Sequence, residues 1–131
     1  MSIFKRNRNN PGSAAITKHE MKRLRTIPRY HKTKTTVFGV PVEVNDTCTL
    51  LGDVYEIIDK NIYQFKARNN RPVIIDCGAN IGMSVVYFKR LYPQSRLIAF
   101  EPDPMLFGML SKNIRNFSFE AVELIQAAVW I

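Results

Sequence analysis

The sequence predicts an α/β fold built around a parallel β-sheet, and three observations lead to this prediction. A short apolar run at residues 73–75 breaks into a carboxylate and a glycine-rich turn. A helical pattern of apolar residues follows over 83–92. A second apolar run, Arg96–Phe100, then ends at Glu101. A strand, a tight glycine turn, a helix and a second strand in immediate succession are typical of a βαβ unit.

Positive charge is concentrated at the N-terminus. The 131-residue chain has a net charge of +8, and residues 1–36 contain ten Lys or Arg against one acidic residue, Glu20. Residues 37–131 contain nine Lys or Arg and ten acidic residues, so this part of the chain is nearly neutral. We therefore expect a basic, flexible N-terminal extension at 1–36 and one folded domain at 37–131. Because the folded part is not basic, the high net charge is not a nucleic-acid footprint on the fold itself.

Within this extension, four apolar residues have the loose spacing of a short helix that ends before Pro28: Ile16, Met21, Leu24 and Ile27. A basic amphipathic helix can bind an anionic membrane or RNA. Segments rich in charge and poor in apolar residues seldom fold alone, so we expect a solvated arm. A non-catalytic module tethered by this arm to RNA or membrane is one alternative to an enzyme.

Two elements are expected between the extension and the first buried strand. Residues 37–44 alternate in polarity and contain Pro41, which predicts a small β element at a sheet edge. Residues 53–65 have a helical pattern. Its apolar face comprises Val54, Ile57, Ile58 and Ile62.

The turn after the first strand has the composition of a ligand-binding loop. Residues 73–75 are β-branched and predict a strand buried on both faces of a parallel sheet. Gly78 and Gly82 combine free backbone dihedrals with no side-chain bulk, as a ligand close to the backbone requires. The unpaired amides at 81–84, where the next helix begins, favour negative or electron-rich groups. We therefore expect a ligand at this turn.

Glu101 completes the pattern at the end of the second strand. It lies about 20 residues beyond Gly82, the offset expected for an acid that accepts hydrogen bonds from a ribose. The strand, the glycines and the acid together predict a nucleotide-type cofactor site. For Asp76 alone, the alternative is a simple turn cap that accepts backbone amides.

The turn contains one specific motif, Asp76-x-Gly78-Ala79-Asn80-x-Gly82. Together with Glu101-Pro102, it resembles the FkbM-type S-adenosylmethionine-dependent methyltransferases over about residues 37–131. The resemblance implies a class I Rossmann-like methyltransferase fold with three layers around the parallel sheet. It also implies S-adenosylmethionine as cofactor and O-methylation of a hydroxyl on a sugar, glycolipid or natural product. An acid two places before the first glycine favours this cofactor over NAD, and a fragment of an NAD-binding oxidoreductase is the alternative enzyme.

The resemblance also implies roles for individual residues. Asp76 and Gly78 would lie against the methionine end of the cofactor, and Glu101 would hold the ribose. Residues 126–129 correspond to the part of the third strand that approaches adenine in that family. The expected cofactor-binding residues are therefore Asp76, Gly78, Ala79, Asn80, Gly82, Glu101 and Ala128.

The remaining elements fit the same fold. Asp103 is placed to cap a second crossover helix and Pro104 to occupy its first position, with apolar spacing continuing to about residue 117. Residues 121–131 predict a third strand. A doubly wound sheet needs more strands than these, so we expect C-terminal strands missing from this chain. Residues 37–131 would then be the N-terminal, cofactor-binding part of a methyltransferase, inactive alone.

Composition narrows the remaining possibilities. No apolar run of about 18 residues and no apolar signal core is present, so we expect a cytoplasmic protein without a transmembrane segment. Cys48 and Cys77 do not have the spacing of a disulfide framework or a zinc site, and no metal is expected. His19 and His31, the only histidines, lie in the basic extension, so no catalytic base is nominated. The expected partner is a small-molecule or carbohydrate acceptor, and the sequence does not define the oligomeric state.

Overall fold

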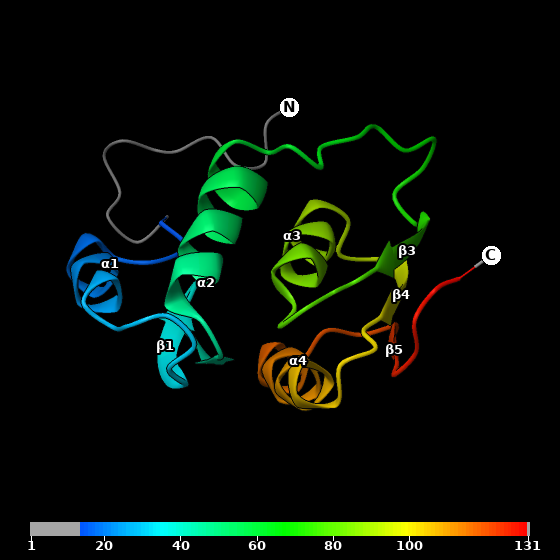
Figure 1. Cartoon of the computed structure of the whole chain (residues 1–131). Coiled ribbons are helices and arrows are strands. Elements are labelled where there is room, and N and C mark those ends of the chain that lie inside the picture. Colours follow the sequence, from blue (N-terminus) through cyan, green and yellow to red (C-terminus); the bar gives the residue numbers. More distant parts are fainter. Residues whose placement is uncertain (1–13, 131) are drawn as a thin grey trace.

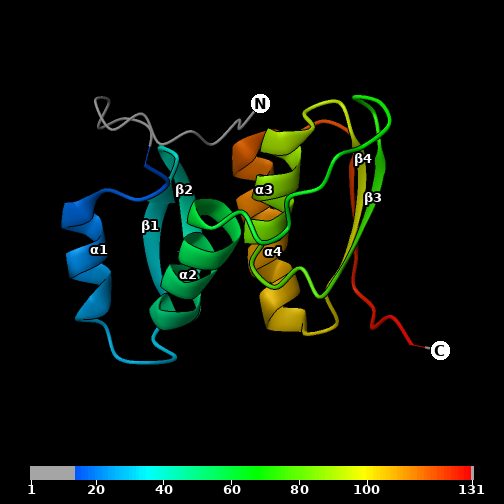
Figure 2. The same ribbon diagram turned by 90° about the horizontal axis from the view of Figure 1, so that it is seen from above.

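The computed structural model describes residues 14–130, which form a β-hairpin, a parallel β-sheet and a group of helices between them (Figure 1). The elements in chain order are α1 (Lys18–Arg25), β1 (Thr33–Val37), β2 (Val40–Val44), α2 (Thr47–Asp53), the π-helical turn η2 (Val54–Asp59), β3 (Val73–Cys77), α3 (Met83–Leu91), β4 (Arg96–Phe100), α4 (Pro104–Phe117) and β5 (Val122–Ile125). Figure 2 shows their layers: α1, the hairpin, the helices α2, α3 and α4, and finally the parallel sheet. The predicted α/β fold is confirmed.

The parallel sheet has the strand order β3-β4-β5. Ile75 pairs with Ile98, and Phe100 pairs with Ile125. Helix α3 connects β3 to β4, and α4 connects β4 to β5, which confirms the predicted βαβ pattern. As a result, the loops that follow all three strands lie at the same edge of the sheet.

Only one face of this sheet is covered by helices of residues 14–130. Helices α3 and α4 lie on the same side in Figure 2, and Ile74 and Leu97 are buried. Val73 and Ile75 alternate with Ile74 and are 65% and 63% exposed. The expectation that residues 73–75 are buried on both faces is therefore wrong for the described chain. A continuous apolar run predicts a strand but does not reveal which of its faces has a covering element.

Helix α4 begins as its cap residues predict. The Asp103 side chain accepts a hydrogen bond from the Leu106 amide at 2.9 Å, and Pro104 is the first helical residue. The helix predicted at 53–65 has different limits in the structure. It begins as α2 at Thr47 and ends with η2 at Asp59. Asp46 caps the start by accepting the amide of Cys48. The helix therefore begins six residues earlier than apolar spacing alone indicates.

The N-terminal β element is a complete hairpin. Its turn residues Phe38 and Gly39 both have positive φ, 52° and 79°, as a two-residue hairpin turn with φ positive at both central positions requires. Val37 pairs with Val40 across this turn, and Thr36 pairs with Pro41. The small β element predicted at residues 37–44 thus contains β2, but the prediction included neither β1 nor a turn at residues 38–39.

Residues 14–36 take part in the fold. Ile16 and Leu24 are buried in the core, and Arg23 of α1 donates to the Lys34 carbonyl of β1 at 2.9 Å. The expected boundary after residue 36 therefore falls inside the hairpin. The expected flexible extension is not found at 14–36, because the apolar side of α1 packs on the rest of the protein. Residues 1–13 lie outside the described part of the chain.

Candidate functional site

The loop between β3 and α3 is fixed to the end of β4 by its own backbone. The amides of Gly78 and Ala79 donate to the Phe100 carbonyl at 2.8 and 2.9 Å, and the Gly82 amide donates to the Ala79 carbonyl at 2.9 Å. Gly78, Asn80 and Gly82 have φ values of 91°, 50° and 107°. Glycine adopts such angles freely, and Asn tolerates them better than most residues, so the motif matches its conformation.

Glu101 joins this loop to the start of α4. Its side chain is buried, with one oxygen accepting the Asn80 amide and the other accepting the Asp103 amide, both at 2.9 Å. Hydrogen bonds to an ionised acceptor are stronger than neutral ones, so this carboxylate holds the loop firmly. A carboxylate can accept about four hydrogen bonds, and both oxygens retain capacity for a further donor.

Asp76 contacts a residue that the motif does not contain. The Ser84 hydroxyl, in the first turn of α3, donates to Asp76 Oδ2 at 2.5 Å. Burial raises the pKa of Asp76, the Ser84 hydrogen bond opposes this rise, and the charge of Glu101 adds to it. Ser84 was not among the predicted site residues. It contacts Asp76 because the loop at 78–82 brings the first turn of α3 back to the end of β3, and this path cannot be read from the spacing of the two residues in the sequence.

Two features of the loop suit a polar ligand. Asn80 Oδ1 is buried without a hydrogen-bond partner among residues 14–130. A Cβ atom placed on Gly78 would meet no atom within 4 Å, so the backbone there borders open space. An orphaned buried oxygen is costly unless a donor pairs with it, and an open glycine permits close approach to the main chain. The loop therefore fits a ligand that brings hydrogen-bond donors.

Gly82 has a different role from Gly78. A Cβ atom at Gly82 would lie 3.0 Å from Leu110 Cδ1 and 3.1 Å from Ile114 Cδ1. Both side chains belong to α4 and are buried. The absence of a side chain at Gly82 therefore allows α4 to pack directly on the loop.

Ala128 lies apart from the other predicted site residues in the chain, but at the same edge of the sheet. Strand β5 ends at Ile125, and residues 126–130 continue without regular secondary structure. The predicted strand over 121–131 is thus shorter in the structure, with residue 131 outside the described part. The structure brings the residues of the motif and Glu101 together, while Ala128 is exposed beyond the end of β5.

Neither a metal site nor a membrane span is found in the described residues. Within 14–130, no three His, Cys, Asp or Glu side chains are grouped so that they could hold a metal ion. No helix in the same range is long and apolar enough to cross a membrane. His19 lies on α1, and His31 precedes β1, so both belong to the N-terminal elements.

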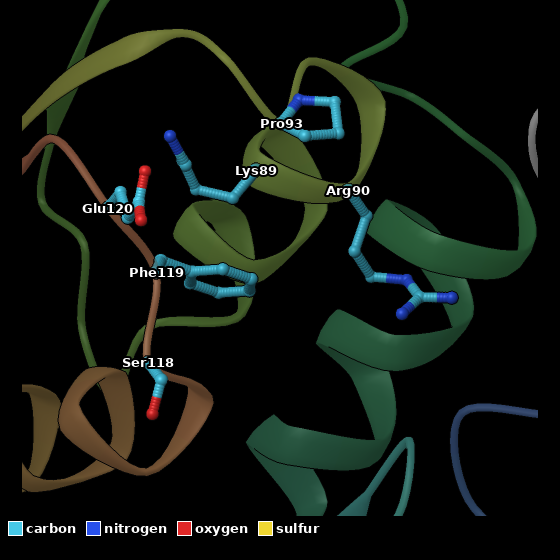
Figure 3. A pocket seen from close by; sticks show the side chains of 6 residues that line it. All are labelled: Lys89, Arg90, Pro93, Ser118, Phe119 and Glu120. Carbon is cyan, nitrogen blue, oxygen red and sulfur yellow. The ribbon is translucent and has the colours of Figure 1, made fainter.

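Figure 3 shows a cavity of about 540 Å³. It lies next to the segments that lead into β4 and β5, at the sheet edge opposite to the loop at 78–82. Its lining residues are Lys89, Arg90, Pro93, Ser118, Phe119 and Glu120. They come from the end of α3 and from the connection between α4 and β5. Lys89 is buried and donates to the Ser95 carbonyl at 2.7 Å, which gives it a structural role. None of the predicted cofactor-binding residues lines this cavity.

Comparison with known structures identifies the class of fold. The chain resembles M. jannaschii TYW2, crystallised in complex with AdoMet, with a TM-score of 0.56 and 21% identity, covering 77% of this chain and 45% of that one. It also resembles P. horikoshii TYW2, crystallised in complex with MeSAdo, with a TM-score of 0.53 and 18% identity, covering 78% and 38%. The chain therefore has a Rossmann-like methyltransferase fold, as the sequence predicted.

Sequence comparison points to the same class of protein. The chain is 37% identical over 75 residues to Methyltransferase sdnD of Sordaria araneosa, covering 56% of this chain and 29% of that protein. It is 37% identical over 79 residues to Methyltransferase 1 of Beauveria bassiana (strain ARSEF 2860), covering 56% and 32%. No family model matches the chain. The chain spans about a third of the length of these curated relatives, and the similarity supports a methyltransferase family.

Proposed function

We propose that this chain is the cofactor-binding part of an S-adenosylmethionine-dependent methyltransferase. The observation that carries the proposal is the loop at 78–82, which is held at the end of β3 by the buried carboxylate of Glu101. The 37% identity to two methyltransferases supports this assignment, as does the fold shared with proteins crystallised with AdoMet and MeSAdo.

In this proposal each site residue binds or orients the cofactor. Glu101 accepts ribose hydroxyls with the lone pairs that its two backbone contacts leave free. Asp76 and Gly78 lie at the methionine end, where a cationic ligand would favour the ionised form of Asp76 and lower its raised pKa. Asn80 Oδ1 accepts a donor of the ligand, and Ala128 is proposed to lie near adenine. When bound, S-adenosylmethionine supplies an electrophilic methyl group.

The acceptor class is inferred from the motif alone. We propose an FkbM-type enzyme that methylates a hydroxyl of a sugar, glycolipid or other natural product. Such a reaction depends strongly on holding the acceptor oxygen in line with the methyl group. No base is proposed for this step, because the two histidines belong to the N-terminal elements.

Calorimetric titration with S-adenosylhomocysteine and, separately, NADH tests the cofactor assignment. In Glu101→Gln the side chain keeps its shape but loses its charge, and its amide nitrogen replaces one of the two oxygens that accept backbone amides. We expect affinity for S-adenosylhomocysteine to fall by about 10- to 100-fold. Glu123→Gln is the matched control, because Glu123 is an exposed β5 carboxylate that pairs with Arg96 at 3.6 Å. Its affinity should equal that of the wild type.

Three other outcomes would contradict the proposal. Unchanged affinity in Glu101→Gln would refute the ribose assignment. Tighter binding of NADH than of S-adenosylhomocysteine would favour the oxidoreductase. Failure to bind either ligand, combined with salt-dependent binding to RNA or anionic vesicles, would favour the tethered module.

A further inference from the structure

Asn113 connects three segments that are far apart in the sequence. It lies on α4 and is fully buried. Its Oδ1 accepts the Glu43 amide of β2 at 2.8 Å, and its Nδ2 donates to the Glu43 carbonyl at 3.0 Å and to the Ile81 carbonyl at 2.9 Å. Ile81 belongs to the loop between β3 and α3. One side chain therefore bonds both the N-terminal hairpin and the candidate cofactor loop.

The chemistry of these three bonds requires a carboxamide. Nδ2 has two N–H groups, and they are used on two different carbonyls, while Oδ1 takes an N–H. Exchanging the oxygen and nitrogen of Asn113 would set donor against donor at Glu43 and acceptor against acceptor at Ile81. An aspartate would keep one bond and present an acceptor to two carbonyls.

The loop is also packed on the same helix by apolar side chains. Leu110 and Ile114, on either side of Asn113 in the sequence, are the residues that a Cβ at Gly82 would meet. Gly82 thus packs against α4, and the Ile81 carbonyl accepts a hydrogen bond from Asn113 of the same helix. Because α4 also packs against β2, the hairpin braces the helix that supports the loop.

We propose that Asn113 is a positioning residue for cofactor binding, and that the β1–β2 hairpin acts through it to fix the loop at 78–82. The binding part of this inference rests on the proposed function. The structural part, that Asn113 restrains the loop, does not. The hairpin is then a supporting part of the cofactor site.

The neighbouring Asn116 offers a control variant in the same helix. Its Nδ2 donates to the Pro41 carbonyl of the hairpin at 3.0 Å, and within residues 14–130 it makes no hydrogen bond to the loop. Asn116→Ala therefore removes a link between α4 and the hairpin only. Asn113→Asp removes the links to both the hairpin carbonyl and the loop carbonyl.

Amide hydrogen exchange of the ligand-free chain is the first test. The amides of Gly78, Ala79 and Gly82 are all hydrogen-bonded and should be protected. In Asn113→Asp we expect their exchange to be about tenfold faster relative to the amides of β4, with no such change in Asn116→Ala. Equal relative protection in both variants would overturn the inference. Asn113→Ser, which keeps one donor and one acceptor, replaces Asn113→Asp if that variant does not fold.

Affinity for S-adenosylhomocysteine is the second test, measured at a temperature where all variants are folded. We expect about a tenfold loss in Asn113→Asp and less than about a twofold change in Asn116→Ala. A loosened loop with unchanged affinity would overturn the positioning role. If the wild type does not bind the ligand but Asn113→Asp still loosens the loop, the proposed function fails while the structural inference stands.

Discussion

Replacing Gly82 with alanine should destabilise the protein more than the same change at Gly39 or Gly78, the other glycines with positive φ among residues 14–130. The reason is that Gly82 combines a φ of 107° with a close contact to α4. The new Cβ would lie 3.0 Å from Leu110 Cδ1 and 3.1 Å from Ile114 Cδ1. Both leucine and isoleucine side chains are buried, so they cannot rotate into solvent to make room.

The magnitude follows from two costs and one gain. Left-handed backbone costs a residue with a Cβ about 1–2 kcal/mol. Overpacking of a buried contact costs about 1–3 kcal/mol more. Alanine also lowers the conformational entropy of the unfolded chain relative to glycine, which stabilises the folded state by about 0.4–1 kcal/mol. We therefore expect Gly82→Ala to lower the free energy of unfolding by about 1–5 kcal/mol. This is a substantial loss against the roughly 5–15 kcal/mol typical of domains.

Urea unfolding of the whole chain measures this loss, with Gly39→Ala as the control. Gly39 has a φ of 79° but no atom within 4 Å of a new Cβ, so only the backbone cost applies there. The transition midpoint of Gly82→Ala should fall well below that of Gly39→Ala at an unchanged slope. If the two variants lose the same free energy, Gly82 is not required for the approach of α4, and our account of the loop is wrong.

Two further variants test other parts of the structure. Gly108 lies on the exposed side of α4 with no atom within 4 Å of a new Cβ. Because glycine is less favourable than alanine inside a helix, Gly108→Ala should raise the free energy of unfolding by about 0.5–1 kcal/mol. An unchanged or lower melting temperature would contradict this expectation. Burial, aided by the charge of Glu56, raises the pKa of Asp53 from 3.8 to about 6. The folded state then holds this proton more tightly than the unfolded state, so stability that Asp53 contributes below pH 3.8 is lost as pH rises to about 6. Melting curves from pH 3.5 to 7 should therefore show wild type losing stability relative to Asp53→Asn over about pH 4–6, and parallel profiles would refute the shift.

The elements that the sequence predicted well are those defined by local signals. Asp103 and Pro104 mark the start of α4 because both act within one helical turn. The glycines of the loop were found because their backbone angles admit few other residues. Strand β4 has the predicted limits, since its apolar run is bounded by polar residues on both sides.

The features that were missed depend on contacts between distant residues. Asn113 falls in the apolar spacing of the helix at 104–117, but the sequence does not show that its carboxamide forms hydrogen bonds with Glu43, 70 residues away. Asp46 caps α2 and also pairs with Arg29 at 2.7 Å, from a segment that charge alone assigned to the solvent. Side-chain polarity predicts exposure on average, but a buried polar residue with all its partners has no separate signature in the sequence.

The burial of α1 also decides how its positive charge can act. Leu24 and Ile16 belong to the apolar side of the segment that was a candidate for binding an anionic membrane or RNA, and both are packed in the core. Withdrawing either side chain would cost about 1.5–3 kcal/mol of burial free energy before any new contact formed. Lys18, Lys22 and Arg25 remain exposed on the other side of the helix. A polyanion could meet these cations without disturbing the fold, whereas a membrane-inserted α1 would have to leave it, so the described structure favours α1 as part of the domain rather than as an inserting tether.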